Sequence, residues 1–360
     1  MTSPLFGSLY TDVPATGIAV RRMQSDMRFV AMRMVPRMLV NKPSGLYRVF
    51  NSGDLNRDEM EARGPYAPAK KAGWRTSSRM FDTDARSLEY DLNDAEAAGS
   101  DVEINPEITI PDVLAYKASM HLERRMSSAY FASGVWYRTI TGAAADTVGT
   151  ATAKDRLYFD NTSADPLEAL TDEIRILSQL TGADPLEMGL TLGARLWHKI
   201  RNHAKVKAQI VGLAGGPIGN AIIGMAQQAS EDQLRQLLGI KWVGVSSAIY
   251  NSAAFDIANP DNESNDYIVP QDDALLYVNP VAGSEAANAT MTPQTRQPPA
   301  FARAVWNGVA GADGEGVQIR KVRDEKAGPG GSWCSIIDVY NGFVVVTPKC
   351  GVRFTGMVTP

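Results

Sequence analysis

Residues 44–65 read SGLYRVFNSGDLNRDEMEARGP, and residues 111–133 read PDVLAYKASMHLERRMSSAYFAS. The first stretch opens a polar excursion, rich in glycine, proline and charge, that continues to about residue 94. A segment this polar cannot bury enough apolar surface on itself to offset the entropy lost on ordering. We therefore expect the excursion to be ordered by lying on something else, most simply on a second copy of the chain.

The second stretch predicts one long amphipathic helix from Pro111 to Ser133. Proline is favoured in a first helical turn, because its missing N–H would be unpaired there in any case. At ~1.5 Å per residue the helix would be roughly 35 Å long, and Gly134 is expected to end it. Its apolar stripe, at three- and four-residue spacing, consists of Leu114, Ala118, Leu122, Met126 and Ala129.

The sequence on either side of this region predicts further elements. Met1–Asn41 has the pattern of an extended arm, with a short strand at Arg28–Met34. The methionines of this arm are either core residues or a flexible surface that adapts to a partner. Residues 135–161 have the alternation and the Gly/Ala/Thr loop of a β-hairpin.

The remaining sequence predicts a mixed α+β fold. A second helix starts at Asp165-Pro166 and ends near Gly182, and short strands alternate with short helices from Asp184 onwards. Near the C-terminus, Asn341-Gly342 is typical of a tight turn and separates two buried strands, Ile336–Val339 and Phe343–Thr347.

The composition indicates an ordinary globular protein. Of its 360 residues, 44% are hydrophobic and 21% are charged. It has no run of ~18 apolar residues of the kind that spans a membrane. Cys334 and Cys350 are too few for a disulfide framework in a chain of this length, so we expect free thiols.

Charge is unevenly distributed along the excursion and its flanks. The net charge of −4 argues against a protein whose main function is to coat DNA. Residues 20–80 are nevertheless rich in arginine, whereas the charged residues of 82–112 are almost all acidic. Such opposite blocks suit head-to-tail contacts between copies, or they are two solvated faces of one subunit.

No sequence motif supports catalysis or cofactor binding. His198 and His203 are five residues apart, which is the wrong spacing for a metal-binding pair on one helix face. The loop Gly212–Gly219 is rich in glycine, but it lacks the spacing of a phosphate-binding motif. The alternative interpretation of the chain as a nucleotide-binding α/β enzyme is supported by this loop alone. We therefore expect no enzyme activity, no catalytic or metal site and no cofactor.

The order of these parts resembles the major capsid protein of tailed bacteriophages, whose HK97-like fold is shared with encapsulins. The resemblance covers nearly the whole chain, through loose patterns rather than invariant strings. The segments that carry it are Ser44–Phe50, Arg57–Pro65, the helix 111–133 with Trp136, Phe159–Asn161, Asp165-Pro166, Ala194–Trp197 and Phe301–Trp306.

The resemblance implies a fold made of an arm, a loop and two domains. These are an N-terminal arm (1–43), an extended β-hairpin loop (44–105), a peripheral domain with a spine helix at 111–133 (106–185) and an axial domain (186–335), with C-terminal strands (336–360) that return to the core.

The function that the resemblance implies is that of a structural shell protein. Such a chain would form the hexamers and pentamers of an icosahedral virion capsid around double-stranded DNA, after assembly in the host bacterial cytoplasm. The alternative is an encapsulin-like compartment shell. No long charged N-terminal helix is present to act as a fused scaffold, so we expect a separate scaffolding protein and a portal as partners, non-specific contact with the DNA, and no membrane. Binding of a decoration protein is left open by the sequence.

The resemblance and the charge blocks together indicate contact residues. We expect no covalent cross-link between subunits, because no lysine, asparagine and glutamate can be assigned to one. Contacts between copies are expected from Arg57, Arg63, Lys70, Lys71, Arg75, Arg79, Asp82, Asp84 and Glu89. Contacts of the arm with a neighbour's acidic block or with DNA are expected from Arg21, Arg22, Arg28, Arg33 and Arg37.

Overall fold

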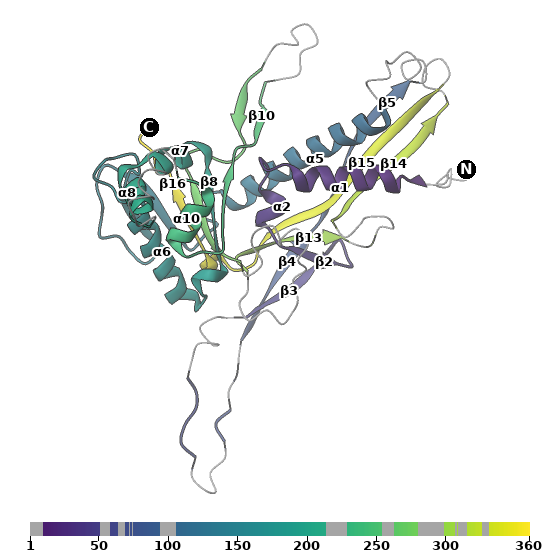
Figure 1. The fold of residues 1–360 in the computed structure, drawn as a ribbon. Coiled ribbons are helices and arrows are strands. Elements are labelled where there is room, and N and C mark those ends of the chain that lie inside the picture. The colour runs from purple at the N-terminus through teal and green to yellow at the C-terminus, as the bar shows by residue number, and fades with distance from the viewer. Residues whose placement is uncertain are drawn as a thin grey trace.

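The computed structural model of the 360-residue chain describes residues 10–50, 58–63, 69–71, 73, 75–93, 106–213, 229–253, 263–279, 299–306, 308, 315–325 and 331–360 (Figure 1). Two six-stranded sheets with their helices form the body, and two short ribbons project from it. The α+β fold class predicted from the sequence is confirmed.

The first sheet is built around one long strand, β15 (Ser332–Val345). On one edge β15 pairs with β14 (Val317–Asp324), and β1 (Tyr10–Thr11) pairs with β14 in turn. Elsewhere β15 pairs with β5 (Asp84–Asn93) and with β13 (Phe301–Trp306), and β2 (Arg37–Val40) lies parallel to β13.

Two helices cover one face of this sheet. The long helix α5 (Pro106–Tyr130) lies over β15, and α1 (Val13–Ser25) lies beside it and over β14 (Figure 1). The short α2 (Ala31–Met34) follows α1. Buried side chains of both long helices meet the inner row of the sheet at Ala15, Ala19, Met23, Leu114, Ala118, Leu122, Ile319, Ile337 and Val339.

The second sheet has the strand order β7-β6-β16-β12-β8-β9. Its strands are β6 (Arg138–Ala143), β7 (Ala153–Leu157), β8 (Met188–Gly193), β9 (Trp242–Ser246), β12 (Ala274–Val278) and β16 (Gly351–Thr355). The helices around it are α6 (Pro166–Thr181), α7 (Ala194–Asn202), α8 (Ala204–Leu213) and α10 (Glu231–Leu238), with the single turns η1 (Pro185–Glu187) and η2 (Pro348–Cys350).

An aromatic cluster joins the two halves into one core. The Tyr130 ring, at the end of α5, stacks on Phe301 of β13 with centroids 4.5 Å apart. Phe301 in turn contacts Trp136 and Tyr277, which belong to the second half. The buried surface is therefore continuous from the first sheet to the second.

Two two-stranded ribbons leave the body in opposite directions (Figure 1). One pairs β3 (Ser44–Phe50) with β4 (Thr76–Asp82), and the other pairs β10 (Ile249–Asn251) with β11 (Asn265–Tyr267).

The prediction of an extended arm with a strand at Arg28–Met34 is wrong. Residues 13–25 form helix α1, which the Asp12 carboxylate caps by accepting from the Ala15 amide at 2.9 Å, and residues 31–34 form α2. Ala15 and Ala19 are buried one helical turn apart, but Pro14 and Gly17 between them obscure this stripe in the sequence. The core role is confirmed for the arm's Met23, whereas Met27 is 69% exposed.

The long helix exists, but both predicted bounds were wrong. It begins at Pro106, so this proline, and not Pro111, occupies the first turn. Pro111 lies in the second turn, where it removes a single i→i−4 hydrogen bond. The helix ends at Tyr130, whose carbonyl accepts from the Trp136 indole at 2.7 Å, and Gly134 follows in the turn with φ of 75°.

The predicted hairpin at 135–161 is also wrong, because β6 and β7 run parallel, with Thr139 opposite Ala153. The chain between them therefore returns to the end of the sheet at which β6 begins. The buried Arg138 guanidinium holds this crossover by donating to the carbonyls of Thr150 and Ala151, at 3.0 and 2.9 Å.

The predicted tight turn at Asn341-Gly342 is absent, since β15 runs straight through it. Here β15 changes partners, from β14 and β5 to β13. The glycine is required by close approach: a Cβ on Gly342 would lie 1.9 Å from the Asp82 carbonyl oxygen.

Elements with local end signals were predicted correctly. Helix α6 starts after Asp165, whose carboxylate accepts from the Glu168 amide, and ends at Gly182 with φ of 72°. Ser230 caps α10, and its hydroxyl accepts from the Gln233 amide. The boundaries predicted at 185/186 and 335/336 run through both sheets, since β6 and β7 lie in the second sheet and β14 in the first.

Candidate assembly surfaces

One face of the β3–β4 ribbon carries an exposed apolar pair next to Arg48 and Ser78. Its register places Leu46 of β3 directly opposite Met80 of β4. These side chains are 74% and 71% exposed, although directly opposed residues on a ribbon are close enough to contact each other. Apolar side chains this exposed on a projecting ribbon are typical of a surface that another molecule covers.

The other face of the ribbon is fixed to the subunit. Phe81 is buried beside Val40 and Ala304. The Tyr47 hydroxyl and the Arg79 guanidinium both donate to the Val345 carbonyl, at 3.2 and 3.3 Å. The ribbon therefore leaves the body at a defined angle, and its outer face carries Leu46 and Met80.

Residues beyond the ribbon lie on the surface where the structure describes them. Arg63, Lys70, Lys71 and Arg75 are exposed, and Lys70 forms an ion pair with Glu61. Arg57 lies outside the described residues. In the same segment Met60 is 92% exposed, which makes it a third bare apolar side chain besides Leu46 and Met80.

The acidic return is anchored in the subunit's own sheet. Strand β5 pairs with β15 along its whole length, from Asp84 opposite Asn341 to Asn93 opposite Ser332. The expectation that the entire excursion is ordered by another copy is therefore wrong for residues 84–93. Leu92 packs against the core on the inner side of this strand, but the surrounding charges masked that pattern in the sequence.

The predicted acidic contact residues lie on this return. Asp82 is exposed at the end of β4, and Glu89 is exposed on β5. The Asp84 carboxylate is engaged within the subunit by Arg86 at 3.2 Å and Arg125 at 3.1 Å. Contacts of Asp82 and Glu89 with a neighbour stay predictions.

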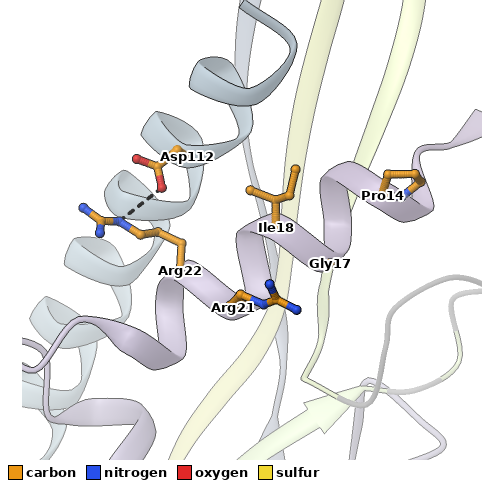
Figure 2. A pocket seen from close by; sticks show the side chains of 6 residues that line it. All are labelled: Pro14, Gly17, Ile18, Arg21, Arg22 and Asp112. Carbon is orange, nitrogen blue, oxygen red and sulfur yellow. Dashed lines mark ion pairs between the residues drawn. The ribbon is translucent and has the colours of Figure 1, made fainter. Parts of the chain in front are cut away.

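Three arginines of the arm lie on or near the helical layer. Arg21 is exposed on α1, and Arg22 forms a salt bridge with Asp112 of α5 at 3.2 Å (Figure 2). Arg28 is exposed and binds Asp26 through two hydrogen bonds from its guanidinium, at 3.0 and 2.7 Å.

Two other arm arginines contribute to the body. The Arg33 guanidinium lies over the Trp242 ring, 5.8 Å from its centroid. Arg37 binds Glu315 at 2.7 Å, and the same buried carboxylate binds the fully buried Arg303 at 2.5 Å. The Arg37 guanidinium is therefore engaged within the subunit.

A buried glutamate on α5 was missed by sequence reasoning. Glu123 is fully buried and accepts three hydrogen bonds, from the Val30 amide at 3.0 Å, the Ala31 amide at 2.7 Å and the Ser246 hydroxyl at 2.9 Å. Burial raises its pKa to about 7. This side chain ties the end of the arm and β9 to the long helix, and its charged sequence neighbours gave no sign of it.

The described residues contain neither a cluster that could bind a metal ion nor a helix that could cross a membrane. Within these ranges no three His, Cys, Asp or Glu side chains come together in a way that could hold a metal ion. None of the helices found there combines the length and hydrophobicity that a membrane crossing needs.

Comparisons with known proteins rest on the fold. No protein-family model matches the sequence, and no curated protein matches it either. Among solved structures, a phage-related protein from Bordetella bronchiseptica RB50 matches with a TM-score of 0.64 and 13% identity, over 98% of this chain and 99% of that one.

A second solved structure carries the same fold in an assembled particle. The capsid of the cyanophage P-SCSP1u matches with a TM-score of 0.51 and 10% identity, over 90% of this chain and 86% of that one. Both matches extend over most of both chains, so the likeness covers the arm, the long helix and both sheets. The chain described here therefore has the HK97-like capsid fold.

Proposed function

We propose that this chain is the major capsid protein of a tailed double-stranded DNA bacteriophage. In this proposal it is a structural protein, not an enzyme, that assembles into the hexamers and pentamers of an icosahedral shell. The observation that carries the proposal is the bare Leu46–Met80 face on a ribbon anchored beside the long helix, in a chain with the capsid fold.

A single subunit leaves the apolar pair Leu46 and Met80 uncovered. A ribbon with one apolar face in water gains stability when a neighbour covers that face, so assembly contributes part of the stability of each subunit. Repeated around closed symmetry axes, one such contact per subunit is sufficient to build a ring.

The proposed parts follow the capsid fold. The β3–β4 ribbon and residues 51–75 act as the clamp on a neighbour. The first sheet with α5 and α1 corresponds to the peripheral domain, and the second sheet with its helices corresponds to the axial domain. The partners we propose are other copies of the chain, a separate scaffolding protein, a portal, a decoration protein and the packaged DNA. Assembly takes place in the host bacterial cytoplasm, without a covalent cross-link.

The first experiment is to express the full chain with its phage-encoded scaffolding partner and to examine the particles by electron microscopy. Closed shells are expected, and nuclease-resistant genomic DNA inside particles from infected cells distinguishes a virion from a compartment shell that holds cargo enzymes. A compact monomer that never forms shells would rule out both.

A deletion tests the clamp itself. Removing residues 55–75 is expected to leave a soluble, folded subunit that forms no shells or only unstable ones. The control replaces these residues by a Gly/Ser linker of equal length, which preserves chain connectivity and is expected to fail in the same way. Normal assembly of either variant would show that this segment is not an intersubunit clamp.

A further inference from the structure

The second ribbon, β10–β11, carries an exposed apolar pair of its own. Its register places Ile249 of β10 directly opposite Tyr267 of β11. These side chains are 40% and 39% exposed, although directly opposed residues on a ribbon are close enough to contact each other. The β10–β11 ribbon therefore has an outer face of the same kind as the Leu46–Met80 face of the β3–β4 ribbon.

The opposite face of the β10–β11 ribbon is fixed to the long helix. Tyr250 alternates with Ile249 along β10, and its ring lies under the Arg124 guanidinium of α5, which is 4.5 Å from the ring centroid. Just after β11, the Ile268 carbonyl accepts from the Ser127 hydroxyl of α5 at 2.8 Å. The ribbon is therefore held in a defined direction, and its outer face points away from α5.

The two ribbons have opposite charge. Residues 247–270 contain four carboxylates and no lysine or arginine, whereas residues 44–82 contain seven cations and five carboxylates. On the outer face of the β3–β4 ribbon, Arg48 is exposed two residues from Leu46, and its guanidinium has no ion pair or hydrogen bond within the described residues. The basic ribbon thus offers an available cation next to its apolar pair.

The acidic ribbon offers a carboxylate in the matching place. Glu263 continues the row of Tyr267 and Asn265, because alternate residues of a strand share a face. A backbone hydrogen bond from Ser252 to Ser264 at 2.8 Å extends the strand pairing towards it. Glu263 is exposed, accepts from the Asn265 side chain at 3.2 Å and forms no ion pair in the part of the chain that the structure describes.

We propose that the outer face of the β3–β4 ribbon of one copy docks on the outer face of the β10–β11 ribbon of the next copy. In this contact the two apolar pairs cover each other, and Arg48 meets Glu263. The inference rests on the proposed capsid function and deepens it, because it names the surface that covers Leu46 and Met80.

The directions of the ribbons suit a head-to-tail contact. They leave the body in opposite directions, so a copy that presents one ribbon to a neighbour keeps the other ribbon for a neighbour on the far side (Figure 1). The same contact can then repeat from copy to copy, and it closes into a ring when the rotation between copies divides a full turn. Rings of this kind are what the hexamers and pentamers of the proposed shell require.

Charge selects this contact over one between ribbons of the same kind. Two β3–β4 ribbons would bring the Arg48 side chains of both copies together, and two β10–β11 ribbons would do the same with Glu263. Like charges in direct opposition are destabilising, whereas opposite charges favour one partner and one register. Duplex DNA suits neither face, since an apolar pair gains nothing on phosphate and the β10–β11 ribbon is acidic.

A pair of cysteines tests the contact directly. Full-length Met80→Cys/Tyr267→Cys is assembled into particles, oxidised and run on a denaturing gel without reductant. A disulfide requires Cα atoms within ~7 Å, so the two ribbons of one copy, which point in opposite directions, cannot cross-link to each other. Each copy is instead expected to link to the next, which gives a ladder of dimers, trimers and larger species.

The single variants are the matched controls for this experiment. Met80→Cys and Tyr267→Cys each retain the native Cys334 and Cys350, and neither is expected to give a ladder. Dimers from Met80→Cys alone would show that the β3–β4 ribbon meets its own kind, which would overturn the inference. Closed shells of the double variant that give no ladder would overturn it too.

An exchange of charge tests the same contact without cysteines. Arg48→Glu and Glu263→Arg are each expected to lower the yield of shells about tenfold, and the double variant to restore it to within about threefold of the wild type. Asp266→Arg, on the other face of the acidic ribbon, is the matched control and should not rescue Arg48→Glu. Because all three side chains are exposed, each variant is expected to unfold at the wild-type urea concentration.

The outcomes separate this inference from the proposed function. Normal assembly by both single charge variants, or a double variant no better than either, would overturn the ribbon contact and leave the capsid function standing. An absence of shells from the wild-type chain would refute the capsid function itself, and the ribbon contact with it.

Discussion

The β3–β4 ribbon and the β6–β7 strand pair are both pairs of short strands, but the subunit supports them in different ways. In each case the two strands are paired with each other. The β6–β7 crossover is held from below by Arg138, which binds the fully buried Glu173 at 2.5 and 2.9 Å. The ribbon has one face on the body and leaves Leu46 and Met80 bare.

This difference separates the work of the single subunit from that of the assembly. Where the chain supplies its own partners, as at Arg138, contacts within the same subunit offset the conformational entropy that a connecting segment loses on ordering. Where it supplies none, as on the outer face of the ribbon, the stabilising contacts must come from elsewhere. A substitution can therefore be predicted to damage folding or assembly according to which region it affects.

The largest effect on the single subunit is expected at Glu173. Glu173→Ala leaves the buried Arg138 guanidinium without its carboxylate, which costs about 3–5 kcal/mol of unfolding free energy. Asp172→Asn is the matched control, since it breaks the more exposed pair with Arg156 and is expected to cost less than ~1 kcal/mol. Urea unfolding measures both, and equal costs would mean that the β6–β7 region is no better supported than the surface.

The next effect depends on pH and concerns Glu123. Burial raises its pKa from 4.5 to about 7 in the folded state, so between these values the folded protein holds a proton that the unfolded chain has lost. The stability that this group contributes is thus greatest at low pH and declines as pH rises to about 7, by about 2–3 kcal/mol.

Glu123→Gln is expected to remove that pH dependence. Its unfolding free energy, relative to the wild type, should increase between pH 5 and pH 8, because the variant has no carboxyl proton to lose. Glu168→Gln, at an exposed position of α6, serves as the control and should follow the wild type. Parallel curves for the wild type and Glu123→Gln would show that Glu123 titrates like an ordinary surface carboxyl.

The sequence could predict elements whose signals are local. The cap at Asp165 and the left-handed Gly182 enclose α6 within its own residues, so its bounds were correct. The apolar stripe indicates α5, but proline at position 111 suggests a first turn there, whereas the helix begins at Pro106.

What the sequence could not predict depends on distant partners. The alternation of β6 and β7 does not reveal that the two strands run parallel, and Arg138, which binds the connection between them, lies outside any local pattern. Asn341-Gly342 has the composition of a turn, yet the backbone of Asp82 requires the glycine within a straight strand. At the candidate site the charged positions were visible, but the bare Leu46–Met80 face was not, because a pattern cannot show which side of a ribbon lacks a cover.

The smallest effect on the single subunit is expected on that face, and it gives the sharpest form of the comparison. Leu46→Ser/Met80→Ser removes apolar surface that is already in water, so the unfolding free energy should change by less than about 0.5 kcal/mol. Phe81→Ala, on the anchored face of the same strand pair, empties a buried position and should cost about 3 kcal/mol or more.

Assembly should respond to the outer-face change although folding does not. Leu46→Ser/Met80→Ser subunits are expected to form fewer or less heat-stable shells at a folded concentration equal to that of the wild type, as measured by sedimentation and electron microscopy. Wild-type assembly by this variant would mean that no neighbour covers the outer face. The contrast between a ribbon completed by another copy and a crossover completed by its own arginine would then have to be abandoned, since both regions would be finished within one chain.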